Sequence, residues 1–179
     1  MSQLAQLSLL AKYNQLMNQR QLEAAAQLPT PALNRDAGAF FGSILGTLNH
    51  ILVGDIVWLK RFAEHPVHYT SLEALRQRKR PDRLDQILYQ ELDELAVERN
   101  LIDGILIDWC RELQADDLDT VLEFQSMMGK PARKNLGDLI LHLFLHQTHH
   151  RGQITTLLCQ QGVDFGETDL VELIPNQPV

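Results

Sequence analysis

The sequence predicts an all-α protein built as a four-helix bundle. Two observations support this prediction: apolar side chains recur at helical spacing in four long segments, and strand signals are few. Helices of this kind bury their apolar faces against one another, which favours an antiparallel bundle. The length of 179 residues suits a single domain, which we expect to span residues 1–179.

The first helix is predicted over Ser2–Leu28. This stretch lacks glycine and proline and is rich in Leu, Ala and Gln, which are good helix formers. Its inner face is defined by Leu7, Leu10 and Met17, and Asn14 falls on the same face. We expect Pro29 and Pro31 to end the helix.

The second helix is predicted over Ala37–Glu64, with Asp36 as its N-cap. It is apolar nearly all round, and such a helix is either buried or placed in a subunit interface as well as in a core. This pattern favours a homodimer. Asp55 lies within the apolar stripe and therefore needs a partner to offset the cost of its burial.

The second half of the chain contains two further long helices. A loop over His65–Pro81 carries a basic stretch that we interpret as solvated surface, and a third helix is predicted from Asp82, its N-cap, to about Leu113. Alternation over Thr120–Phe124 and a turn at Met128–Pro131 indicate a small hairpin before the last helix.

The last helix is predicted to begin after its cap, Asn135, and to run to about Gln161, where Gly162 ends it. The acidic tail over Val163–Val179 is expected to pack only in part.

Composition and charge exclude several classes of function. The net charge of −7 argues against nucleic-acid partners, because binding to phosphate backbones depends on Lys and Arg. No apolar run approaches the ~18 residues of a membrane span, and the two cysteines are far apart. The N-terminus lacks the basic region of a signal peptide. We therefore expect a cytoplasmic protein with neither nucleic-acid nor membrane partners.

Histidines are the unusual feature of the composition, because four of the seven fall within residues 141–150. On a helical wheel His146 and His150 lie within roughly 20° of the core residue Leu139. His142 lies at the edge of this face, and His149 points further away. The pair at positions i and i+4 that faces inward is therefore His146 and His150.

Two imidazoles one helical turn apart can converge on one metal ion. His142 is eight residues from His150, a rise of about 12 Å, so both cannot join the same ligand set. His142 either supports the site as a neighbour or pairs with Asp138. The third ligand is expected to be His50, since Gly46 and Gly54, one turn away on either side, leave space around its imidazole.

Several segments resemble the DinB/YfiT-like family of helical metalloproteins. His146-Gln147-Thr148-His149-His150-Arg151-Gly152-Gln153 is similar to the family's signature in its fourth helix, with Gly162-Val163-Asp164 and Thr168-Asp169-Leu170 following. Leu48-Asn49-His50-Ile51-Leu52, with Asp55 and Trp58-Leu59, resembles the signature of the second helix, and Tyr13-Asn14 with Asn18 that of the first.

The resemblance implies an up-down-down-up bundle, often dimeric, that binds a divalent metal ion through His50, His146 and His150. Members of the wider family look like thiol S-transferases, isomerases that use a small thiol, or proteins without a known activity. The family's name refers to induction after DNA damage, which suggests a stress response but describes expression rather than chemistry.

The functional hypothesis is a metal-dependent enzyme that activates a small thiol, or water, for transfer to or hydrolysis of a small-molecule substrate. Three histidines leave open coordination positions, and imidazole suits zinc, nickel or iron. Positions 147–149 hold no Glu, so the general base of zinc peptidases is missing. We assign no catalytic residue. The polar side chains expected around the ligands are Asp55, Asn14, Gln153 and His142.

Two alternatives remain open at this stage. One is a non-catalytic dimeric bundle with a structural metal, and the other is a histidine-rich core without metal. A closed sphere of four protein ligands would favour the first alternative.

Overall fold

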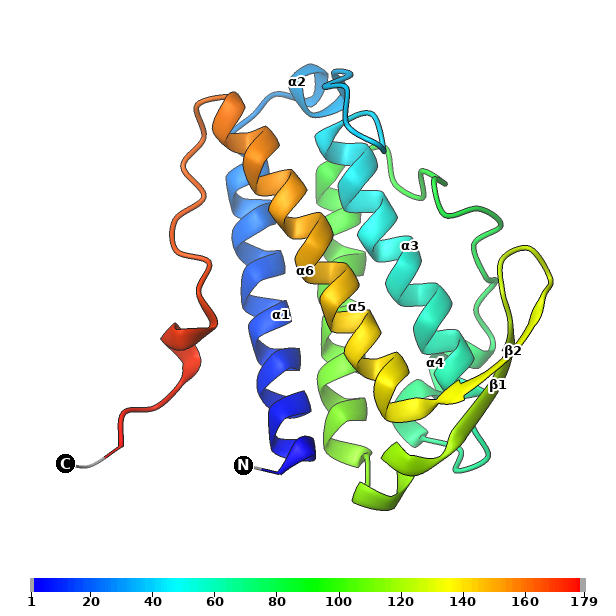
Figure 1. The fold of residues 1–179 in the computed structure, drawn as a ribbon. Coiled ribbons are helices and arrows are strands. Elements are labelled where there is room, and N and C mark those ends of the chain that lie inside the picture. Colours follow the sequence, from blue (N-terminus) through cyan, green and yellow to red (C-terminus); the bar gives the residue numbers. More distant parts are fainter. Residues whose placement is uncertain (1, 178–179) are drawn as a thin grey trace.

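The computed structural model describes residues 2–177, and most of them are helical (Figure 1). In chain order its elements are α1 (Gln3–Ala25), α2 (Thr30–Asn34), α3 (Ile44–Ala63), η1 (Thr70–Leu72), α4 (Glu73–Arg76), α5 (Leu92–Glu112), η2 (Ala115–Asp119), β1 (Val121–Gln125), β2 (Pro131–Asn135), α6 (Leu136–Gln160) and η3 (Leu170–Leu173). The prediction of a mostly helical fold with one small hairpin is confirmed.

The four long helices lie side by side around one core. α1 packs mainly against α5 and α6, and α3 packs against the same two helices, so α1 and α3 lie diagonally opposite. Figure 1 shows α1 and α6 running in one direction and α3 and α5 in the other. Large side chains such as Trp109, Tyr69 and Phe62 are fully buried. Each buried side chain of this size contributes roughly 1.5–3 kcal/mol to stability.

The second long helix begins later than the sequence pattern indicates. α3 starts at Ile44 rather than Ala37, and its N-cap is Ser43, whose hydroxyl accepts a hydrogen bond from the Gly46 amide at 3.0 Å. The preceding residues form a tight turn in which Gly38 and Gly42 have φ of 66° and 76°. Positive φ is incompatible with a right-handed helix, so the prediction of Asp36 as the cap is wrong.

The third long helix also begins later, at Leu92 rather than Asp82. The side chain of Asn49 holds the connection before it: its Oδ1 accepts from the amides of Leu88 and Tyr89 at 2.8 and 3.0 Å. Its Nδ2 also donates to the Tyr89 carbonyl at 2.9 Å. These tertiary contacts satisfy backbone groups that a helix would otherwise pair, so the segment stays non-helical, with a turn at residues 84–85.

The apolar surface of α3 is covered within a single chain. It packs against α6, α5, α4, α2 and η1, and 17 of its 20 residues are buried. Burial inside one subunit therefore accounts for the all-round apolar pattern, and that pattern no longer argues for a dimer.

The final helix matches its prediction closely. The hairpin pairs β1 with β2 in antiparallel register, with Val121 opposite Asn135. Asn135 then caps α6, since its Oδ1 accepts from the Asp138 amide at 2.9 Å. Gly162, with φ of 78°, follows the helix as predicted.

The tail packs in part, as predicted. Val163 and Phe165 are buried, whereas most of the residues that follow are exposed. An ion pair between Arg20 and Glu172, at 2.8 Å, ties the tail to α1.

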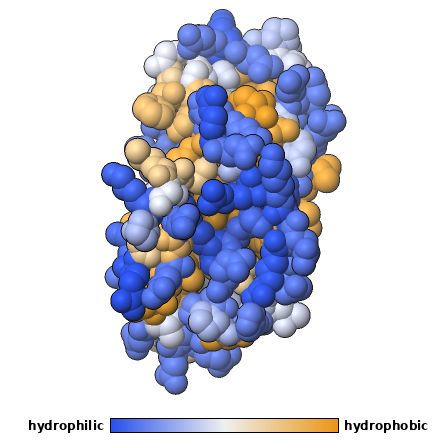
Figure 2. All heavy atoms as spheres, turned by 90° about the vertical axis from the view of Figure 1, so that its right-hand side faces the viewer, coloured by the Kyte–Doolittle hydropathy of each residue, from blue (hydrophilic) through white to orange (hydrophobic). Residues whose placement is uncertain are grey.

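The surface is mostly polar on the side of the hairpin and the connection before α5 (Figure 2). Hydrophobic side chains on this face are separated by hydrophilic ones. Within residues 2–177, none of the helices is both long and apolar enough to cross a membrane.

Candidate metal centre

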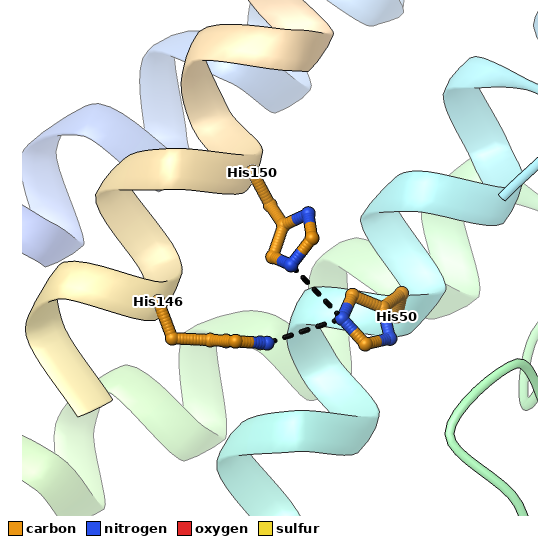
Figure 3. A group of neighbouring side chains, drawn as sticks. All are labelled: His50, His146 and His150. Carbon is orange, nitrogen blue, oxygen red and sulfur yellow. Dashed lines mark hydrogen bonds between the residues drawn. The ribbon is translucent and has the colours of Figure 1, made fainter. Parts of the chain in front are cut away.

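Three histidines meet between α3 and α6, as the sequence predicts for His50, His146 and His150. His50 comes from α3 and the other two from α6, and all three imidazoles point toward one another (Figure 3). The Nε2 atom of His50 lies 3.1 Å from the Nε2 atoms of both His146 and His150. One ligand atom of each side chain lies within 4.8 Å of the others, so the group has the dimensions of a metal site.

Hydrogen bonds fix the tautomers of two of these imidazoles. The Nδ1 atom of His50 lies 2.8 Å from the Leu84 carbonyl oxygen, which can only accept, so Nδ1 carries the hydrogen. The Nδ1 atom of His150 donates in the same way to Gln153 Oε1 at 2.8 Å. The Nε2 atoms of both neutral rings therefore present lone pairs to each other.

Burial keeps the imidazoles uncharged. It is the main reason that the pKa values of His50 and His150 lie below the ordinary value of 6.5. Burial, together with the neighbouring His150 and His50, lowers the pKa of His146 to about 3. Neutral imidazole is the form that binds metal ions, so the pocket holds its donors ready at neutral pH.

The donor set fits a divalent cation. Two lone-pair nitrogens 3.1 Å apart repel each other unless a positive charge lies between them. A hydrogen on His146 Nε2 would turn the contact between His146 and His50 into a hydrogen bond. The two lone pairs of His50 and His150 would still repel each other. A metal ion bound at ~2.0–2.1 Å by each nitrogen would separate tetrahedral ligands by ~3.3 Å, close to the observed spacing.

Three residues that support the histidines have roles the sequence did not reveal. Asn49 holds the connection whose Leu84 carbonyl orients His50. Phe41 stacks on the His50 ring, with centroids 3.6 Å apart and planes inclined by 15°. The sequence marks Asn49 only within the motif around His50 and gives Phe41 and Leu84 no role.

Gly54 is the space-making residue that the sequence suggested, but it makes room for a different histidine. A Cβ atom at Gly54 would lie 2.9 Å from Cε1 of His146, so the imidazole and α3 touch here.

Gly54→Ala is therefore expected to weaken metal binding by about 10- to 100-fold, the loss typical when support of a ligand is disturbed. Alanine favours a helix interior over glycine by ~1 kcal/mol, so stability should not fall in parallel. Metal titration and thermal unfolding of the same samples measure the two effects. Gly104→Ala in α5 is the matched control, because a Cβ there meets nothing within 4 Å. Equal affinities of the two variants would contradict the expectation.

The four supporting polar residues predicted from the sequence separate into two groups. Gln153 lies at the site, where it accepts from His150. Asp55 does not contact a ligand histidine, because it forms an ion pair with Arg99 in the core. Asn14 likewise lies in the core, where its Nδ2 donates to Asp103 at 3.1 Å.

His142 lies beside the site rather than in it. Its ring centroid is 6.0 Å from that of His146 and 5.2 Å from that of Trp58. His142 and Trp58 also line a groove of about 480 Å³, together with Lys134 and Asp138. Within residues 2–177, no hydrogen bond joins His142 to Asp138. Because His142 precedes His146 by one helical turn on α6, the groove ends about one turn from His146.

Fold and site together define a class: a mostly helical protein with three converging histidines that could hold a metal ion. The chain belongs to the DinB family, because the profile of that family matches residues 1–177. It is similar to Protein DinB of Bacillus subtilis (strain 168), with 24% identity over 160 residues, which cover 89% of this chain and 88% of that protein. No solved structure matches the chain significantly.

Proposed function

We propose that His50, His146 and His150 bind one divalent cation and that the protein is a metal-dependent enzyme acting on a small molecule. The supporting observation is the pair of 3.1 Å Nε2–Nε2 contacts, which one central cation satisfies and one hydrogen does not. Zinc, nickel and ferrous iron all suit imidazole ligands. The proposal includes the up-down-down-up four-helix bundle as the fold class, supported by the helix directions in Figure 1.

Three protein ligands leave coordination positions for a further molecule. When bound, the ion would lower the pKa of a thiol or water in such a position and so supply a nucleophile at neutral pH. The protein's own residues would orient the ligand histidines and give the substrate access to the ion. Leu84 and Gln153 hold two of the imidazoles, and Phe41 shields His50 from water. The groove beside His142 gives the substrate a place, with the Lys134 ammonium available to an anionic group.

Thiol transfer is the reaction we propose, with hydrolysis as its variant. A thiolate is intrinsically the stronger nucleophile toward an electrophilic carbon, whereas metal-bound water gains from a general base that takes up its proton. Asp55 is the carboxylate that the sequence placed near the site, and it is bound to Arg99 instead. Asp55 therefore supplies no base to a bound water, which supports a sulfur nucleophile.

The proposal also includes the location, oligomeric state and partners of the protein. We propose a cytoplasmic homodimer with a role in stress responses and with neither nucleic-acid nor membrane partners. The net charge of −7 supports the exclusion of nucleic acid. Leu141 and Leu145, which are 47% and 60% exposed on α6, give a second copy an apolar surface to cover. Light scattering on a size-exclusion column tests the dimer.

Metal analysis of the untagged protein tests the central claim. We expect one equivalent of a first-row metal per chain, and we expect a chelator to lower the melting temperature. A screen of small thiols with electrophiles then tests catalysis, with His50→Ala as the inactive control. If the purified protein contains no metal and a chelator leaves its melting temperature unchanged, the metal site is refuted. A metal closed off by a fourth protein ligand would refute the enzyme and leave a structural ion.

A further inference from the structure

A second pocket lies on the other side of α6 from the histidines. It has a volume of about 230 Å³ and lies between α1, α6 and the tail, with Tyr13, Met17, Arg151, Gly152, Phe165 and Thr168 in its walls. This is far more than the ~30 Å³ that one water molecule occupies in the liquid. The tail that closes it is tethered, because the Tyr13 hydroxyl donates to the Thr168 carbonyl at 2.6 Å.

The pocket contains a buried positive charge. Arg151 is only 5% exposed, and its guanidinium donates to two neutral oxygens, Asn14 Oδ1 and Thr148 Oγ1. None of the ion pairs within residues 2–177 includes Arg151. Asp103 is hydrogen-bonded to Asn14 rather than to Arg151, and Arg99 binds that carboxylate directly.

The bonds to Asn14 and Thr148 occupy two of the five N–H donors of Arg151. Burying a charge is costly unless it is paired, and a guanidinium matches the two oxygens of a carboxylate. The other walls favour an apolar body, because the ring of Tyr13, the thioether of Met17 and the ring of Phe165 line the same space. The Tyr13 ring also lies over the guanidinium, with its centroid 5.3 Å from Cζ.

We propose that this pocket binds a small organic carboxylate, with its carboxylate on Arg151 and its apolar body between α1 and the tail. The site is separate from the three histidines, since Arg151 faces α1 whereas His146 and His150 face α3. The proposal does not depend on metal binding.

Gly152, which lies in the pocket wall, provides a variant that adds a side chain there without disturbing the fold. A Cβ at Gly152 meets nothing within 4 Å, so Gly152→Leu places its side chain in open space while improving helix propensity. Gly104→Leu is the matched control, because Gly104 also lies in a long helix with open space at its Cβ but does not line the pocket. Arg151→Met removes the charge at similar length.

The experiment is calorimetric titration of the full chain with benzoate, with its neutral analogue benzamide and with inorganic phosphate. We expect wild type and Gly104→Leu to bind one benzoate, and Gly152→Leu and Arg151→Met to lose at least tenfold in affinity. At ten times Kd, benzoate should raise the melting temperature of wild type by roughly 3–6 °C. His146→Ala should bind benzoate as wild type does, which excludes coordination of benzoate by a metal.

Three outcomes would overturn the proposal. They are no saturable binding of benzoate to wild type, equal binding to Gly152→Leu, and equal binding of benzamide. Binding of phosphate in place of benzoate would likewise reject an organic carboxylate. If Arg151→Met fails to fold, Gly152→Leu alone still decides the question.

Discussion

His146→Ala and His150→Ala are each expected to reduce bound metal from one equivalent per chain to background, whereas His149→Ala should leave it unchanged. The Nε2 atoms of His146 and His150 converge on that of His50. The exposed His149 instead lies 3.3 Å from the amide nitrogen of Gln153, on the far side of that side chain from the site. Elemental analysis of untagged protein after gel filtration measures the difference.

His149→Ala is the matched control, because it removes the same side chain from the same helix. Circular dichroism should show that all the variants keep their helices. Gln153→Ala should be intermediate between the ligand variants and His149→Ala in metal binding. It should bind a full equivalent of metal at saturation, but with affinity lowered by about 10- to 100-fold, since only the orientation of His150 is lost. Similar metal loss in His149→Ala would contradict the assigned ligand set.

Most of the histidine cluster could be predicted because two of its members are close in the sequence. His146 and His150 are one turn apart on a helix whose cap, Asn135, and stop, Gly162, are both readable in the sequence. His50 required the further assumption that its helix packs against this one. That assumption holds because α3 and α6 are neighbours.

The starts of α3 and α5 could not be predicted, because distant groups set them. The side-chain oxygen of Asn49 accepts hydrogen bonds from the backbone amides of Leu88 and Tyr89, about 40 positions later in the chain. The pattern of apolar residues over 82–91 looks helical, yet tertiary hydrogen bonds decide its conformation. The same contacts bring the Leu84 carbonyl to His50, so the part of the fold that the sequence missed is also part of the site.

Asp55 illustrates the same limit inside the core. The sequence showed that this carboxylate needs a partner and suggested a ligand histidine. The partner is Arg99, whose guanidinium binds Asp55 and, at 2.9 Å, Asp103. Arg99 lies 44 positions away on α5, and no local pattern links the two residues.

Arg99→Met is expected to destabilise the protein by about 3–5 kcal/mol at neutral pH, because it leaves two buried carboxylates without their cation. Asp55 and Asp103 are 0% and 1% exposed, and Arg99 is 4% exposed. For a chain of this size the loss corresponds to a fall in melting temperature on the order of 10 °C. Chemical denaturation measures the free energy of unfolding directly.

The matched control is Arg111→Met on the same helix. Arg111 pairs with Asp108 at 3.0 Å, but both side chains are 64% exposed. A surface pair of this kind contributes ~0–1 kcal/mol, so this variant should unfold almost as wild type does. Comparable losses in the two variants would show that Arg99 does not act through burial of the carboxylates.

The pH dependence separates an electrostatic loss from a simple packing defect. Burial raises the pKa of both Asp55 and Asp103 above the ordinary 3.8, and removing Arg99 takes away the main opposing influence. The folded variant therefore takes up protons at a higher pH than the unfolded chain does. Its stability relative to wild type should rise as the pH falls from neutral toward 3.8. A gap that stays constant with pH would indicate a packing defect alone, since a cavity carries no charge.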